Sequence, residues 1–203
     1  MSGSAPTWVD THCHVYDERT PGGADGSIAN ALAHDVTKVI VIGTDADTTR
    51  LALDIAARHH NVWATVGLHP HDAKLGFDTI APYVSGASPD DLRSKRIVAI
   101  GECGLDFYYD HSDRDVQRAV FAQQIALAKQ LDLTLVIHTR NAWPDTFDVL
   151  DAEGKNLDNG RSIACSNVMM PSTPANVVIV LHTRLFVELS DLVNAPIPVA
   201  LTW

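Results

Sequence analysis

Histidine and carboxylate side chains stand in this sequence where short apolar runs end. His12 and His14 follow the apolar start of Trp8–Val15. Residues i and i+2 of a strand point to the same face, so these two imidazoles can bind one cation from one side. Glu102, between glycines, follows the apolar run at 97–100, and a single carboxylate can bridge two cations. The pattern predicts metal binding, although an HxH motif alone also arises from two unrelated histidines.

A histidine and an arginine end another apolar run. His138 closes the run Leu133–His138, and Arg140 follows two residues later as a candidate phosphate-binding cation. A lone histidine in such a place is more often a core residue than a ligand. The functional interpretation of His138 therefore depends on the other strand ends.

Two more histidines, His69 and His71, follow the run Val62–Leu68, where a glycine and a proline shape a tight exit from the strand. For His71 a loop histidine without function is at least as good an interpretation. Asp106, beyond Glu102, fits either a functional or a solvated role.

Five short β-branched runs alternate with helix-length segments. The runs are almost continuously apolar, as is typical of parallel strands covered on both faces, and the alternation predicts an α/β fold with a parallel sheet. We predict strands at Trp8–Val15, Lys38–Thr44, Val62–Leu68, Ile97–Gly101 and Leu133–His138.

The clearest predicted helices are Asp47–His60 and Asp113–Leu131. Ser112 precedes the second helix and Asp115 follows three residues later, which fits a capping box. Glycine-rich Gly22–Gly26 and polar Ser85–Asp91 are predicted as surface loops. The predicted apolar face of the second helix comprises Val116, Val120, Leu127 and Leu131.

Four of the five strand ends carry His or Glu, and the carboxyl ends of parallel strands in a barrel meet at one face. Imidazoles with a carboxylate suit Zn²⁺, Mn²⁺ or a related divalent ion. Two bridged cations would activate water against a phosphoryl or carbonyl centre. Cys13 and Cys103 alternate with the proposed ligands and are interpreted as packing residues.

Composition excludes several classes of protein. The chain has 203 residues, 46% of them apolar, which fits one domain, and its net charge of −10 argues against a broad basic surface for nucleic acid. No apolar run reaches membrane-spanning length, residues 1–6 lack the features of a signal peptide, and three cysteines make no disulfide framework, so a cytoplasmic location is expected. The sequence contains no G-x-S-x-G elbow, no P-loop and no dinucleotide fingerprint.

The motifs together resemble the TatD family. They are DTHCH at Asp10–His14, GLHPH at Gly67–His71, GECGLDFYYD at Gly101–Asp110, VIHTR at Val136–Arg140, and RxxQxxxFxxQ at Arg114–Gln124. The likeness covers about residues 8–150. It implies a TIM-type (β/α) barrel, a two-metal site, and hydrolysis of DNA phosphodiester bonds by a metal-activated water.

The resemblance also implies roles for single residues. His12 and His14 match ligands of the first metal, and His138 matches a ligand of the second. Glu102 matches the bridging, catalytic carboxylate, and His69 matches a position near the substrate phosphate. The chain departs from the family at Asn141, where an aspartate is usual, and at Thr134, where a proline is common.

After residue 153 the strand–helix rhythm stops, so the expected domain is 1–203 with a barrel portion at 8–152 and an anomalous tail at 153–203. The family's later metal-binding histidine and late aspartate have no counterpart there, and His182 is the only later histidine. Strands are possible at Val177–Leu181, Leu185–Leu189 and Val199–Leu201.

Two alternatives stay open. The chain is either an active metal-dependent hydrolase with DNA as its substrate, or a truncated, catalytically impaired relative that only binds metal. Among enzymes, a related amidohydrolase acting on an amide or ester has the same ligand types. The expected cofactors are two divalent ions, Zn, Mg or Mn, and neither a membrane nor a stable protein partner is expected.

Overall fold

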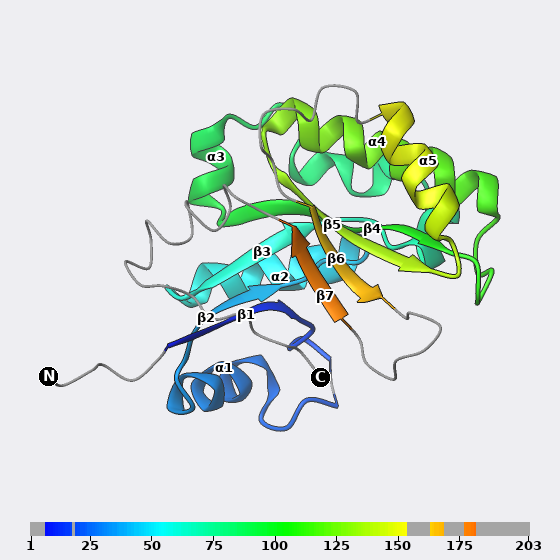
Figure 1. The fold of residues 1–203 in the computed structure, drawn as a ribbon. Coiled ribbons are helices and arrows are strands. Elements are labelled where there is room, and N and C mark those ends of the chain that lie inside the picture. The colour runs from blue at the N-terminus through cyan, green and yellow to red at the C-terminus, as the bar shows by residue number, and fades with distance from the viewer. Residues whose placement is uncertain (1–6, 18, 154–162, 169–176, 182–203) are drawn as a thin grey trace, which may run out of the picture.

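The strands form one curled sheet with helices packed against it (Figure 1). The computed structural model describes residues 7–17, 19–153, 163–168 and 177–181, the last two segments by their backbone. In this part of the chain the strand order follows the sequence from β1 to β7. The strands are β1 (Trp8–Cys13), β2 (Val36–Val41), β3 (Val62–Val66), β4 (Ile97–Asp106), β5 (Thr134–Arg140), β6 (Ile163–Val168) and β7 (Val177–Leu181).

All five strands expected from the sequence are present, adjacent and parallel. One boundary differs in a way that matters for the site. The strand expected at Ile97–Gly101 runs on to Asp106, because β4 shifts register after Ile100 and then pairs again with β5 from Cys103 onward. Glu102 therefore lies inside a strand, at the irregularity, rather than behind the strand end.

Helices follow the strands and cover one face of the sheet. They are α1 (Gly23–Ala33), α2 (Ala46–Arg58), α3 (Pro89–Ser94), α4 (Arg114–Leu131) and α5 (Trp143–Glu153), with short 3₁₀ turns at Pro70–Leu75, Phe77–Thr79 and Ala81–Tyr83. The starts of α1 and α3 fall in the segments Gly22–Gly26 and Ser85–Asp91, which were expected to be loops. α1 begins at Gly23 behind a left-handed Gly22, and α3 begins behind Ser88, whose hydroxyl caps the backbone of Asp91.

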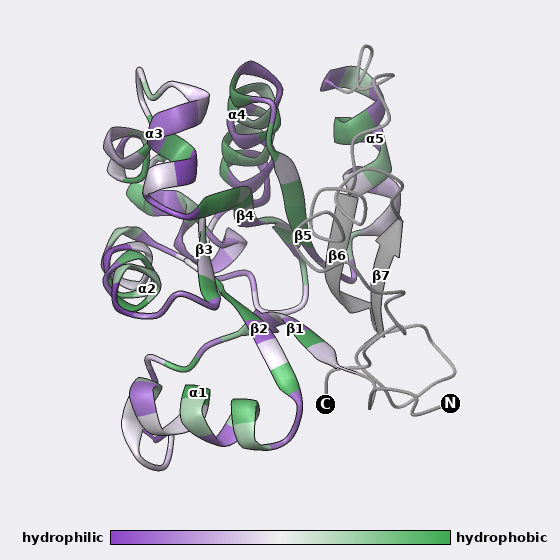
Figure 2. Cartoon of the chain, turned by 90° about the vertical axis from the view of Figure 1, so that its left-hand side faces the viewer, coloured by the Kyte–Doolittle hydropathy of each residue, from purple (hydrophilic) through white to green (hydrophobic). Residues whose placement is uncertain are grey.

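The hydrophobic core lies between the sheet and these helices. Strand residues alternate between the two faces, so Val39 and Val41 of β2 pack toward α1 and α2 while Ile40 and Ile42 face the other side. Apolar residues accordingly appear along the strands β2 to β5 and on one side of α4 in Figure 2. Cys103 is buried in the core, and Cys13 packs against the buried residues of β2, α1 and α2, as expected of packing residues.

The prediction for α4 needs two corrections. Asp113, not Ser112, is the N-cap, because its side chain accepts a hydrogen bond from the Asp115 N–H. Val116 is exposed, because the buried face of the helix is rotated to include the polar side chains of Gln117 and Gln124.

The barrel pattern stops at β7. β6 pairs with β5 in parallel and continues the series, whereas β7 pairs with β6 antiparallel. β7 confirms the strand expected at Val177–Leu181, and β6 was not expected. The possible strands Leu185–Leu189 and Val199–Leu201 lie outside the described residues, as does His182. None of the described helices is both long and apolar enough to span a membrane.

Candidate metal centre

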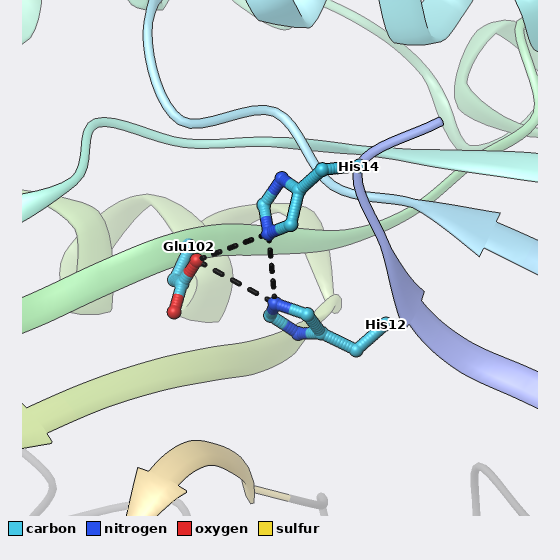
Figure 3. Close-up of side chains that lie close together, drawn as sticks. All are labelled: His12, His14 and Glu102. Atoms are coloured by element: carbon cyan, nitrogen blue, oxygen red, sulfur yellow. Dashed lines mark hydrogen bonds and ion pairs between the residues drawn. The ribbon is translucent and has the colours of Figure 1, made fainter. Parts of the chain in front are cut away.

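Two histidines from the end of β1 face one carboxylate from β4. The Nε2 atoms of His12 and His14 are 3.2 Å apart, and they lie 3.6 and 4.0 Å from Oε2 of Glu102. Figure 3 shows the rings of His12 and His14 both pointing toward the carboxylate of Glu102. These three side chains offer ligand atoms that lie within 4.8 Å of one another.

The electrostatics of this group suit a cation. Burial lowers the pKa of both His12 and His14, which outweighs the opposing attraction of Glu102, so both rings are neutral near pH 7. Burial alone would raise the pKa of Glu102, but the surrounding imidazoles, led by His138, hold it below its usual range. Neutral imidazoles and an ionised carboxylate are the forms that bind divalent metals.

Tyr16 fixes the ring of His14. Its hydroxyl donates to the carbonyl oxygen of Ile42 at 2.8 Å and lies 2.8 Å from Nδ1 of His14. Burial raises the pKa of Tyr16 to about 12, so the hydroxyl keeps its proton. Because that single proton is used on Ile42, Nδ1 of His14 must be the donor, and its Nε2 presents a lone pair to the site.

Replacing Tyr16 by phenylalanine should therefore weaken metal binding without unfolding the protein. Loss of a residue that orients a metal-ligating histidine costs about 10–100-fold in affinity. Titration of the metal-free chain with Mn²⁺ or Zn²⁺ measures the effect. Tyr83→Phe is the matched control, since Tyr83 also donates to a backbone carbonyl, that of Ala46, at 2.8 Å. Equal affinities in the two variants would remove Tyr16 from the site.

A second group uses the other oxygen of the same carboxylate. Oε1 of Glu102 lies 3.5 Å from Nδ1 of His138, and His69 completes a set of ligand atoms within 4.8 Å. Nδ1 of His138 is buried with no hydrogen-bond partner in the described part of the chain. A buried, unsatisfied nitrogen aimed at a carboxylate is what a removed metal ion would leave, so these residues fit a metal site.

Asp106 orients His138 from behind. Its Oδ2 accepts from Nε2 of His138 at 3.0 Å and lies 2.9 Å from Nε2 of His71. Burial alone would raise the pKa of Asp106, but these hydrogen bonds, with those from the Tyr108 and Tyr109 N–H groups, hold it below its usual range. Asp106 is thus a supporting carboxylate, and His71 is its partner.

His138 is held between two carboxylates. Burial alone would lower its pKa, but the hydrogen bond to Asp106 and the negative charge of Glu102 raise that pKa to about 8. Without metal the ring therefore carries a positive charge near neutral pH. A cation at Nδ1 would replace that proton and keep the charge balance of the site.

Two glutamines of α4 connect the helix to the strand ends. Gln117 accepts from the N–H and donates to the carbonyl of Asp106, at 2.8 and 3.1 Å. Gln124 makes the same pair of hydrogen bonds to Leu68, at 2.9 and 3.0 Å. Both are buried. Gln117 thus fixes the end of β4, where Asp106 lies. Gln124 fixes the segment after β3, which leads to His69.

Close backbone approaches complete the arrangement. A Cβ at Gly104 would collide with the carbonyl oxygen of His138, and one at Gly67 would collide with the backbone of Gly101 and Glu102. Both glycines therefore allow neighbouring strands to approach closely enough for the ligand groups to meet.

The structure brings His12, His14, Glu102, His69 and His138 together. His69 lies within the second candidate ligand group, whereas the sequence resemblance gave it a place near the substrate phosphate. Arg140 lies beside this centre with its guanidinium over the rings of Tyr108 and Tyr109, 4.1 and 4.5 Å from their centroids.

Sequence reasoning left out Tyr16, left Asp106 undecided, and included Gln117 and Gln124 only as parts of the RxxQxxxFxxQ motif, without a role. The glutamines did carry a signal. They lie seven residues apart on the core side of an amphipathic helix. A polar residue at a core position must find hydrogen-bond partners there.

Parallel strands β1 to β6, with candidate histidine and glutamate ligands gathered near their carboxyl ends, define the class: a TIM-type barrel fold with a candidate metal centre. Residues 9–163 match the model of the TatD related DNase family, and the chain belongs to this family.

The curated relatives are named as metal-dependent hydrolases or as exonucleases. The chain is 34% identical over 151 residues to "Uncharacterized metal-dependent hydrolase YabD" of Bacillus subtilis, which covers 74% of this chain and 58% of that protein. It is 35% identical over 127 residues to "3'-5' ssDNA/RNA exonuclease TatD" of Cronobacter sakazakii, covering 63% of this chain and 47% of that protein. The chain thus spans about half the length of the curated relatives it matches.

The fold has a counterpart among solved structures. The crystal structure of YjjV, a TatD homologue from Escherichia coli K12, matches with a TM-score of 0.62 and 28% sequence identity over 72% of this chain and 56% of that chain. This likeness supports the barrel fold class expected from the sequence.

Proposed function

We propose that this chain is a metal-dependent nuclease that hydrolyses phosphodiester bonds in DNA. One observation carries the proposal: the two oxygens of Glu102 face separate histidine groups, His12 with His14 on one side and His138 with His69 on the other. A carboxylate shared in this way is the ligand that a two-metal site requires.

The two groups would hold two divalent cations, with Glu102 common to both. Bound cations would supply the charge that activates water and neutralises the phosphoryl oxygens during hydrolysis. The residues of this chain supply the rest. Glu102 stays ionised in its buried position, and Asp106 and Tyr16 fix the rings of His138 and His14.

Substrate binding falls to Arg140. Arg140 ends β5 two residues after His138, and its guanidinium forms no ion pair with a carboxylate in the described part of the chain. An arginine that is not neutralised by a carboxylate can bind a phosphate with two parallel hydrogen bonds. The names of the TatD relatives, which specify single-stranded DNA and RNA, support nucleic acid as the substrate.

Cleavage of a labelled single-stranded oligonucleotide by the full chain tests the proposal. We expect cleavage that Mg²⁺, Mn²⁺ or Zn²⁺ stimulates and that EDTA abolishes, because the bound cations would activate the water and neutralise the phosphate. The double variant His12→Ala/His14→Ala should lose metal from one group and with it most of the activity. His34→Ala/His60→Ala removes two histidines outside both groups and serves as the control.

The outcomes separate the alternatives. Metal bound in stoichiometric amounts without cleavage would identify a metal-binding relative with no catalysis. Hydrolysis of an amide or ester substrate, with no action on the oligonucleotide, would favour an amidohydrolase. Unchanged metal content and cleavage in the His12→Ala/His14→Ala variant would show that the chemistry lies elsewhere.

A further inference from the structure

The turn after β4 exposes two neighbouring aromatic rings. Tyr108 is 56% exposed and Tyr109 is 48% exposed, although both follow a strand whose residues are buried. Exposed apolar surface that is contiguous, as at two adjacent rings, can mark a ligand-binding site.

These rings are held in a fixed relation to the candidate metal centre. The N–H groups of Tyr108 and Tyr109 donate to Oδ1 of Asp106 at 2.9 and 3.0 Å, and the other oxygen of Asp106 accepts from His138. One carboxylate thus anchors both the turn and a candidate metal ligand.

A series of ring contacts leads from the centre to the turn. The ring of His69 lies 4.4 Å from that of His138 and 4.4 Å from that of His71, between centroids. The ring of His71 in turn lies 5.4 Å from Tyr109, which stacks on His111. Tyr109 is therefore a near neighbour of the residues that would bind metal.

Positive charge accompanies the rings. Arg140 lies over both tyrosines, and Lys74 donates to the carbonyl oxygen of His111 at 3.1 Å. Neither cation forms an ion pair with a carboxylate of the described residues. In a chain of net charge −10, two such cations beside exposed aromatic rings complement a ligand that has both phosphates and flat rings.

We propose that Tyr108 and Tyr109, whose rings meet edge to face at 88°, form a stacking platform that takes one unpaired base of a single-stranded nucleic acid at a time, while Arg140 binds its backbone. The inference rests on the proposed nuclease function and adds to it a reason for preferring single strands. Stacking on a protein ring requires an open base face, and the neighbouring pairs of a duplex cover that face.

Binding of a labelled oligothymidylate, compared with an abasic strand of equal length and equal phosphate number, tests the platform. The measurement uses fluorescence anisotropy of the full chain in EDTA, where metal-dependent cleavage cannot interfere. The wild type should prefer the base-bearing strand. Tyr108→Leu/Tyr109→Leu should weaken that binding by about 5- to 150-fold, the equivalent of stacking one base, and should leave abasic binding unchanged.

Two further variants separate stacking from a structural role. Tyr108→Phe/Tyr109→Phe keeps the rings and should retain binding. Phe147→Leu removes a ring that is 55% exposed on α5 and should change nothing. A leucine variant that loses affinity equally for base-bearing and abasic strands would overturn the platform, and so would a wild type that does not distinguish the two strands.

The platform and the nuclease proposal fail in different ways. Base-dependent binding without cleavage in the presence of metal would overturn the nuclease function and support the platform. Metal-dependent cleavage without base-dependent binding would overturn the platform and support the nuclease.

Discussion

Glu102→Gln should remove most of the metal binding and the cleavage that we expect of this protein. The change keeps the size of the side chain but removes the negative charge shared by the two histidine groups. One carboxylate serves both candidate metals, so both should bind more weakly at once. We expect metal affinity to fall by more than the roughly 10–100-fold that follows removal of a residue that only supports a ligand. The metal content of purified protein and cleavage of single-stranded DNA measure it.

An exposed glutamate provides the control. Glu153→Gln makes the same chemical change at the end of α5, outside both ligand groups, and should leave metal content and cleavage unaltered. Thermal unfolding of both variants establishes that each is folded. Cleavage that survives Glu102→Gln at wild-type rate would place the active site away from this carboxylate.

The positions and parallel pairing of the five strands could be predicted because each strand is marked by its own local run of apolar residues. Each run of apolar, β-branched residues is typical of a buried parallel strand, and the helix-length spacers are long enough for the crossovers that parallel strands require. The polar residues at the ends of these apolar runs then had to lie near one face, even though β4 continues beyond Glu102. His12, Glu102 and His138 are close in space for this reason, although they are far apart in sequence.

The supporting residues could not be predicted because their partners are set by packing. Asp106 contacts His138 only because β4 continues past its register shift, and no sequence pattern marks that continuation. Tyr16 depends on where the backbone of Ile42 lies. The helix α1 was missed because its glycines indicate a loop, while its burial of Ile28 against the sheet outweighs that local preference.

Gly104→Ala should be among the most destabilising single changes in the described chain. Gly104 has φ of +125°, a region that side-chain-bearing residues rarely adopt. Its missing Cβ also leaves space for the carbonyl oxygen of His138 on the adjacent strand. An alanine cannot relieve both problems by turning a side chain, since the obstacle is backbone. We expect the free energy of unfolding to fall by about 3 kcal/mol, near the upper end for single substitutions.

Gly86→Ala separates the steric clash from the cost of the dihedral angle. Gly86 also has a positive φ, +70°, but no atom lies within 4 Å of a Cβ built there. Gly86→Ala should lower the free energy of unfolding by about 1 kcal/mol, the cost of a left-handed residue with a side chain. Urea unfolding gives both values, and metal titration should show weaker binding for Gly104→Ala alone, because displacing β4 from β5 separates Glu102 from His138. Equal losses in the two variants would mean that the strands can part at Gly104 without cost, and that the close approach of β4 and β5 does not hold the metal centre together.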